Sequence, residues 1–305
     1  MWLILAFCSA ALLGFYDVFK KLALSDNAVL PVLFLNTMIC SLLFLPFILL
    51  SSCTNMLDGS MFYVEQCGWE QHKYILLKAC IVLSSWVFGY FAMKNLPITI
   101  VGPINATRPV MVLVGAMLVF GERLNVWQWC GVLLAIISFF LLSRSGKKEG
   151  VDFRHNKWIY FLVLAAVLGA VSGLYDKYLM ASPDNGGVGL SRMVVQSWYN
   201  IYQQFLMGVT MLLIWWPTRK KTTAFTWRWS ILFISLFLSA ADFVYFYALI
   251  LPGAMISIVS MVRRGSVVVS FCCGAAVFKE RNLKSKAIDM LLVLLGMIFL
   301  YIGTR

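Results

Sequence analysis

A pattern that occurs twice constrains this sequence more than any other feature. Gly-Phe-Tyr-Asp at residues 14–17 returns as Gly-Leu-Tyr-Asp at 173–176, and Phe-Gly-Glu-Arg at 120–123 returns as Phe-Lys-Glu-Arg at 278–281. The two copies of each pattern are separated by nearly the same number of residues. This regular separation indicates an internal duplication, so the chain is expected to fold as two similar halves.

The composition predicts a chain that is embedded in a membrane. Of the 305 residues, 61% are hydrophobic and only 12% are charged, whereas a soluble domain carries about 25% charged residues. Several apolar runs reach the roughly 18 residues that a helix needs to cross hydrocarbon. The net charge of +12 comes mainly from short segments between these runs, which is typical of orientation signals. The lipid bilayer is therefore an expected partner, and nucleic acid is not.

The apolar runs divide the chain into two groups of five. A basic segment at 144–156 separates residues 1–143 from residues 157–305. An odd number of spans in each half makes the second half enter the membrane from the opposite side, so we predict inverted repeats. The fold class is all-α and integral to the membrane, with ten transmembrane helices at residues 2–22, 30–51, 74–95, 98–120, 125–143, 157–179, 194–216, 228–249, 253–277 and 285–303.

The distribution of basic residues predicts how these spans are oriented. One side of the predicted topology holds 16 Lys and Arg residues and the other side holds 6. Because basic loops stay in the cytoplasm, the 144–156 segment is expected inside and both termini outside. The polar loop at 52–73 then faces outward as well. Its two cysteines, Cys53 and Cys67, are expected to form a disulfide in that oxidising environment.

The sequence resembles a known family at specific motifs. Phe-Gly-Glu-Arg-Leu-Asn at 120–125 precedes the glycine-containing apolar stretch 131–137, and Phe-Lys-Glu-Arg-Asn at 278–282 precedes the tenth span. These marks and the ten-span layout resemble EamA-type members of the drug/metabolite transporter superfamily over nearly the whole chain. The resemblance implies a transporter. It does not indicate the substrate, because relatives transport very different small molecules. Many relatives are described with cytoplasmic termini, the reverse of the orientation that the basic residues predict here.

The repeated motif supplies one pair of candidate functional residues. Asp17 is expected near the cytoplasmic end of the first span and Asp176 near the outer end of the sixth, with Tyr16 and Tyr175 beside them. Two interpretations stay open. Each aspartate is a helix-end carboxylate paired with a nearby base, such as Lys20 or Lys21 for Asp17, or the two are copies of one gate element.

Charges at mid-depth form the second group of candidates. Arg108 follows Pro97 by eleven residues, and Arg263 follows Pro252 by the same interval, with Arg264 next to it. A helix that rises 1.5 Å per residue brings these arginines close to the bilayer centre, where an unpaired charge costs at least about 2.5–3.5 kcal/mol. Asp242 is the carboxylate expected nearest to them. The arginines therefore bind an anion, which their planar guanidinium suits, or they form a structural network with Asp242.

Two further residues are candidates for substrate binding. The fourth span contains internal prolines, which free backbone carbonyls, and Asn105 lies between them. Its amide is expected to satisfy a freed carbonyl or to bind substrate. Trp86 occupies the repeat position that corresponds to Asp242, so it is expected to line the cavity.

These patterns predict a transporter that is not driven by ATP, because the sequence contains no phosphate-binding Gly-Lys-Ser/Thr motif. We expect a secondary transporter of a small organic anion or zwitterion that works by alternating access. No cofactor is expected, and a proton or a sodium ion is the candidate coupling ion. The expected location is the cell membrane, a bacterial inner membrane. The alternatives are an exporter of hydrophobic or cationic compounds and a membrane-embedded enzyme that acts on a lipid-linked substrate.

Overall fold

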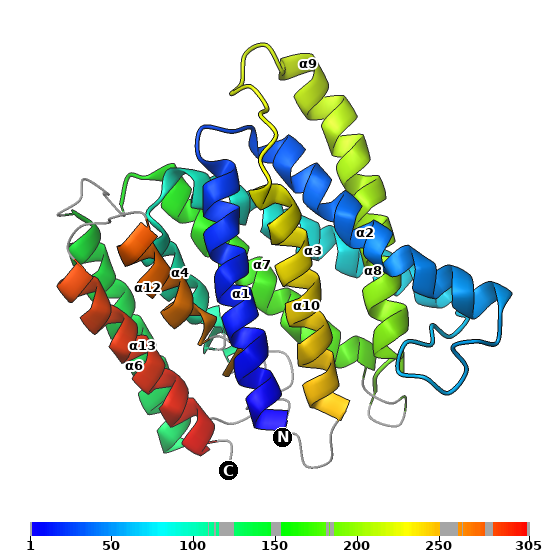
Figure 1. Cartoon of the computed structure of the whole chain (residues 1–305). Coiled ribbons are helices and arrows are strands. Elements are labelled where there is room, and N and C mark those ends of the chain that lie inside the picture. The colour runs from blue at the N-terminus through cyan, green and yellow to red at the C-terminus, as the bar shows by residue number, and fades with distance from the viewer. Residues whose placement is uncertain are drawn as a thin grey trace.

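The protein is a bundle of long helices (Figure 1). A computed structural model describes residues 2–108, 110–112, 114–115, 125–147, 154–180, 183, 186–250, 262–263, 265–277 and 283–303. Within these ranges the chain contains helices, turns and loops, and no strand.

Each of the ten predicted spans overlaps a helix in the described residues. The fourth and ninth spans do so only in part, because their helices are Ile98–Ala106 and Ser266–Val277 and parts of both spans lie outside the described residues. The third helix begins five residues earlier than the predicted start at residue 74. The seventh span continues from α8 through a π-helix, η2, into α9 without a break. The helices of the first half are α1 (Trp2–Leu24), α2 (Val29–Cys53), α3 (Trp69–Asn95), α4 (Ile98–Ala106) and α6 (Val126–Lys147); those of the second half are α7 (Lys157–Met180), α8 (Arg192–Thr210), η2 (Met211–Trp215), α9 (Trp216–Thr218), α10 (Ser230–Ile250), α12 (Ser266–Val277) and α13 (Leu283–Gly303).

Three of the described helices are long and apolar enough, by length and composition, to cross a membrane. They are α2, α3 and α7. Large apolar side chains such as Leu212, Leu213 and Ile214 are more than half exposed on the outside of the bundle. A surface of this kind is a liability in water and matches a lipid environment.

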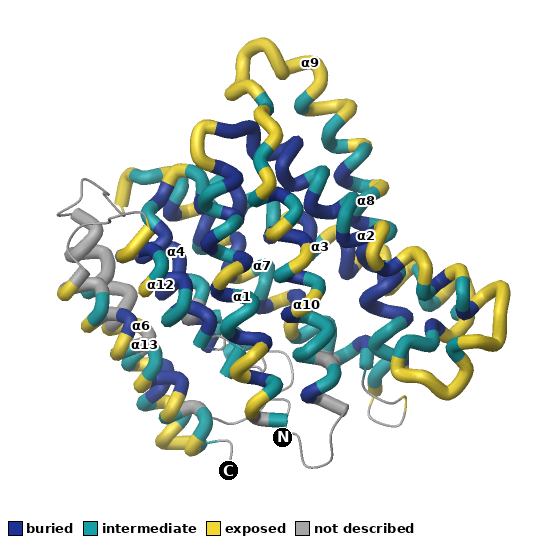
Figure 2. Tube along the Cα trace, in the orientation of Figure 1, coloured by how far each residue is buried: buried dark blue, intermediate teal, exposed yellow. Residues whose placement is uncertain are grey.

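Helices from the two halves pack against each other. α1 lies along α10, α7 lies along α3, and α6 lies along α13 (Figure 1). Small residues bring α12 close to its neighbours, because a Cβ at Gly14 would lie 2.5 Å from Val269 Cβ and one at Gly102 would lie 2.6 Å from Val267 Cγ2. Close approach through small residues is how helices gain contact energy in a membrane. Buried residues of the main core come from α1, α2, α3 and α4 of the first half and from α7, α8 and α10 of the second (Figure 2).

Both chain termini lie at the same end of the bundle, and the 54–68 loop is toward that end too (Figure 1). At the opposite end, the turn between α1 and α2 is tied to the loop that follows α9. The Asn27 amide donates to the carbonyl oxygens of Ala23 at 3.0 Å and Thr226 at 2.8 Å, and its own oxygen accepts from Thr226 N. These bonds connect the first half to the second half at that end.

The expected disulfide between Cys53 and Cys67 is wrong in this structure, where both thiols are free. Cys67 Sγ instead lies 3.3 Å from His72 Nε2, at the start of α3. Burial raises the pKa of the Cys67 thiol, which keeps it in the protonated form. The polar loop is therefore attached to α3 by a thiol–imidazole contact.

Candidate functional site

The first charged cluster lies near the end of α1. Lys20 Nζ donates to Asp17 Oδ1 at 2.7 Å, and the lysine is only 7% exposed. The same nitrogen lies 4.3 Å from the centre of the Tyr16 ring and 5.4 Å from the centre of the Tyr90 ring. Of the two bases expected for Asp17, Lys20 is therefore the partner. Lys21 points to backbone oxygens instead, at 2.7 Å from Met93 O and 2.5 Å from Leu96 O.

The second cluster joins α3 to α7. Lys78 Nζ pairs with Asp176 Oδ1 and lies 5.1 Å from the centre of the Tyr199 ring. Lys78 is only 6% exposed, so it is not one of the exposed bases that orient the outer side. A lysine within an apolar span, where a lone charge is costly, was the available signal.

The two tyrosines of the repeated motif have different surroundings. Tyr16 is 6% exposed and packs in the main core. Tyr175 lies at the edge of the bundle, where its hydroxyl donates to Tyr74 O at 3.3 Å. The ring beside the buried lysine of the second cluster is that of Tyr199, on α8. Sequence position therefore did not identify the tyrosine that accompanies the second ion pair.

The third cluster contains two of the residues that were expected at mid-depth. Arg263 Nη2 pairs with Asp242 Oδ1 on α10, and both side chains are less than one-fifth exposed. The guanidinium also lies 4.4 Å from the centre of the Tyr245 ring, close enough for a cation–π attraction. Arg264, the neighbouring candidate, lies outside the described residues.

Arg108 has a different environment from the other buried cations. Its guanidinium lies against Gly169 of α7, where an added Cβ would be 2.8 Å from Nη1 and 2.9 Å from Cζ. Arg108 Nε is buried and has no hydrogen-bond partner, and within the described residues Arg108 makes no ion pair. Gly169 therefore leaves room for the guanidinium, and the carboxylate within electrostatic range of Arg108, that of Asp17, is already paired with Lys20.

The remaining two candidates flank this region. Asn105 precedes Arg108 on α4, and its Oδ1 is buried without a hydrogen-bond partner. Trp86 is partly buried and packs against the main core from α3. Both contribute to the interior.

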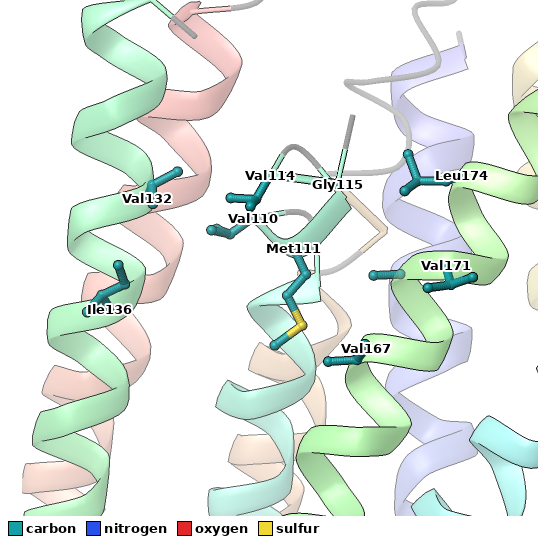
Figure 3. Close-up of a pocket in the computed structure, with 10 residues that line it drawn as sticks. Val110, Met111, Val114, Gly115, Val132, Ile136, Val167, Val171 and Leu174 are labelled. Atoms are coloured by element: carbon teal, nitrogen blue, oxygen red, sulfur yellow. The ribbon is translucent and has the colours of Figure 1, made fainter. Parts of the chain in front are cut away.

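An apolar cavity of about 360 Å³ lies on the other side of α7 (Figure 3). The cavity is lined on α7 by Val167, Ala170, Val171 and Leu174, which lie on one face of that helix. Gly169, which contacts Arg108, lies on the opposite face. Figure 3 shows it between α6 and α7, with the 110–115 segment in between. It has no charged lining and is separate from the charged clusters; it is lined by Val110, Met111, Val114, Gly115, Val132, Ile136, Val167, Ala170, Val171 and Leu174.

Comparison with known proteins identifies the family. Residues 1–144 match the family model described as the EamA-like transporter family. Residues 1–144 are therefore an EamA-like transporter domain, a family of the drug/metabolite transporter superfamily. No curated protein matches the sequence. A solved crystal structure is similar to this chain with a TM-score of 0.63 and 15% identity, and the match covers 98% of both chains. At that identity the likeness concerns the fold alone.

The interior of this EamA-like transporter also holds polar residues that sequence analysis missed. On α8, Gln196, Asn200 and Gln203 recur at the spacing of one helix face, and each is at most 3% exposed. On the adjoining α2, Asn36 is fully buried and its Oδ1 accepts from Ser235 Oγ of α10 at 2.9 Å. Amides at helical spacing in an otherwise apolar span were the signal that could have revealed this face.

Within the described part of the transporter, no three His, Cys, Asp or Glu side chains gather in a group that could hold a metal ion. The charged chemistry of the interior consists of three ion pairs and the unpaired Arg108. This arrangement can bind and orient an anion. It also brings lysine, aspartate and tyrosine side chains close enough to exchange hydrogen bonds.

Proposed function

We propose that this EamA-like transporter carries a small organic anion or zwitterion by secondary transport. Residues 1–143 and 157–305 form two inverted five-helix repeats joined by the basic linker 144–156. The repeats rock against each other, so a central site faces each side of the membrane in turn. An ion or solute gradient drives transport, with a proton or a sodium ion as the coupling ion.

The helix packing supports the two-repeat arrangement. α1 on α10 and α7 on α3 are the same type of contact with the two halves exchanged. A serine hydroxyl connects each pair, with Ser9 Oγ donating to Ala241 O and Ser85 Oγ donating to Ala165 O, both at 2.7 Å. Such exchange of contacts is expected for repeats related by a two-fold axis in the membrane plane.

One observation carries the sign of the substrate: among the described residues Arg108 makes no ion pair with a carboxylate, although its Nε is buried. Three other cations of the described interior, Lys20, Lys78 and Arg263, each pair with an aspartate. Those pairs cancel formally and leave one positive charge. A buried charge is costly unless it is paired or solvated, and a substrate anion would remove that cost. Arginine's fork suits carboxylate or phosphate.

The repeat alignment explains why Arg108 is left over. Arg108 corresponds to Arg263, and Trp86 occupies the position that corresponds to Asp242. The second repeat therefore carries an arginine with its own carboxylate, whereas in the first repeat the aligned position of that carboxylate is occupied by a tryptophan. In this proposal Arg108, Asn105 and Trp86 contact substrate together with Arg263, and Arg264, which lies outside the described residues, is a further candidate.

The ion pairs differ in their suitability for gating and coupling. Lys20 and Asp17 are both on α1, so that pair with Tyr16 orders one helix and does not lock two together. Lys78 and Asp176 join α3 of the first repeat to α7 of the second. We therefore assign the stronger gating role to Asp176, with Tyr175 beside it, and the coupling role to Asp242.

The test is solute exchange in vesicles that contain only this protein. Small carboxylates, amino acids and lipophilic cations are each loaded inside, and uptake of the labelled compound is measured. We expect exchange of carboxylates or amino acids and none of the cations. Exchange of lipophilic cations alone would contradict the proposed substrate sign. Turnover of an added lipid without flux of any solute would favour the enzyme alternative.

Orientation in the membrane provides a separate prediction. Without the buried Lys20 and Lys78, the basic residues still number 15 on one side and 5 on the other. The exposed Cys53 should therefore react with an impermeant maleimide in intact cells. A cysteine introduced by Lys221→Cys, in a variant whose Cys53 is replaced by serine, should react only after the membrane is opened. The opposite pattern would show that the termini are cytoplasmic.

A further inference from the structure

The buried polar face of α8 is unusual because many of its atoms have no partner. Hydrogen-bond partners are missing for Gln196 Nε2, Ser197 Oγ and both amide atoms of Gln203. These three side chains are between 0% and 2% exposed. Buried polar groups in proteins are nearly always hydrogen-bonded, to protein or to water. A cluster of exceptions on one helix face therefore points to a polar occupant.

Neighbouring helices enclose this face and add to it. Thr37 Oγ1 of α2 donates to Gln204 Oε1 of α8 at 2.8 Å, and Ser235 Oγ of α10 donates to Asn36 Oδ1 of α2. Asn36 Nδ2 is a further buried donor without a partner. Side chains of α2 are thus hydrogen-bonded to both neighbouring helices, while other amide groups of the same side chains and of α8 remain without a partner.

The same face continues toward the third charged cluster. Ser235, Ser239 and Asp242 recur on one face of α10, and Ser239 Oγ lies 3.7 Å from Cys40 Sγ of α2. Tyr199 of α8 lies within electrostatic range of Asp242. The unpaired amides therefore adjoin the Arg263–Asp242 pair and do not form an isolated defect.

We infer that Gln196, Ser197 and Gln203 of α8, together with Asn36 of α2, form a binding subsite for the hydroxyl groups of a polyhydroxylated substrate. The unpaired atoms include three amide donors, one amide acceptor and one hydroxyl. A hydroxyl group both donates and accepts, so it complements this mixture. The apolar chain of a fatty acid or a lipophilic drug would leave all of these groups unpaired, which is a strong basis for rejection.

This inference rests on the proposed function, which gives the substrate a negative charge. It adds that the uncharged part of the substrate carries hydroxyl groups. Matched probes separate the two ideas. Gluconate and hexanoate share a six-carbon chain and a carboxylate but differ in their hydroxyl groups, and glucose has hydroxyl groups without the charge. Thermal stabilisation of the purified protein by each compound reports its binding.

We expect gluconate to stabilise the wild-type protein more than hexanoate does. Gln203→Leu should weaken gluconate binding about five- to tenfold, the loss expected for one or two neutral hydrogen bonds, and should leave hexanoate unaffected. Hexanoate binding as well as gluconate, or no stabilisation by gluconate or glucose, would overturn the hydroxyl subsite. If Arg108→Gln leaves the binding of gluconate and hexanoate unchanged, the anion proposal fails. The hydroxyl subsite is then tested by whether glucose stabilises the wild-type protein.

A measurement without any ligand tests the same idea on the protein alone. Because the Gln203 amide is unpaired, Gln203→Leu should leave the melting temperature unchanged or raise it. The matched control is Gln204→Leu on the next residue, which removes the bond from Thr37 and should lower the melting temperature by about 2–4 °C. An equal fall in both variants would mean that Gln203 is structural, and would overturn the inference.

Discussion

Arg263→Gln should destabilise the folded protein by about 3–5 kcal/mol, because it leaves Asp242 buried without its partner. In the native structure the two side chains pair and are 18% and 15% exposed. An isolated buried carboxylate must be desolvated or protonated, and either costs free energy of folding. Unfolding by denaturant in detergent, together with expression level, measures this loss.

A double variant provides the control for that result. Arg263→Gln combined with Asp242→Asn removes both charges, so it should recover most of the lost stability. Asp242→Asn alone leaves the arginine unpaired and should also destabilise, unless that aspartate carries a proton during transport. Normal folding and gradient-driven transport in Asp242→Asn would remove Asp242 from both the structural and the coupling role. Equal stability of Arg263→Gln and the wild type would show that the pair contributes nothing.

Arg108→Gln should weaken binding of a transported anion by roughly ten- to a hundredfold, with little loss of stability. The estimate is the loss of a charge-assisted hydrogen bond, about 1.5–3 kcal/mol. The melting temperature should change little, because Arg108 has no ion-pair partner among the described residues. Replacing it with glutamine therefore leaves no buried carboxylate unpaired. Binding isotherms and melting curves of the same preparation separate the two effects.

Two companions make the Arg108 result specific. Arg108→Lys keeps the charge but cannot present a planar fork, so it should rescue binding only partly. Lys221→Gln removes an exposed charge far from the interior and should change neither binding nor melting temperature. A folded Arg108→Gln protein with unchanged affinity would eliminate Arg108 as the anion site. A protein that fails to fold would support the structural interpretation instead.

The contrast between the two arginines follows from their partners. Both lie eleven residues after a proline at matching repeat positions, so the sequence alone predicts the same behaviour for each. In the structure Arg263 forms an ion pair with Asp242. Arg108 instead lies against Gly169 of α7, which has no side chain and carries no charge. Pairing is therefore decided by residues on other helices, which no local pattern near either arginine specifies.

The sequence by itself determined the helices, their number and the family. Apolar runs of membrane length require helices, since hydrocarbon offers no other partner for the backbone, and the repeated motifs marked two halves. The expected disulfide failed because sharing a loop does not bring Cys53 and Cys67 together. The predicted equivalence of Tyr16 and Tyr175 did not extend to their surroundings, because Tyr16 is buried in the main core whereas Tyr175 is only partly buried against a second cluster.

Only the tertiary structure decided which buried polar groups satisfy each other. Lys78 meets Asp176 from another helix of the other half, and Gln204 is bonded by Thr37 while its neighbour Gln203 is not. The physical reason is the range of the forces involved. Hydrophobicity acts on each segment separately and can be read along the chain, whereas hydrogen bonds and ion pairs act over a few ångströms between helices that only folding brings together.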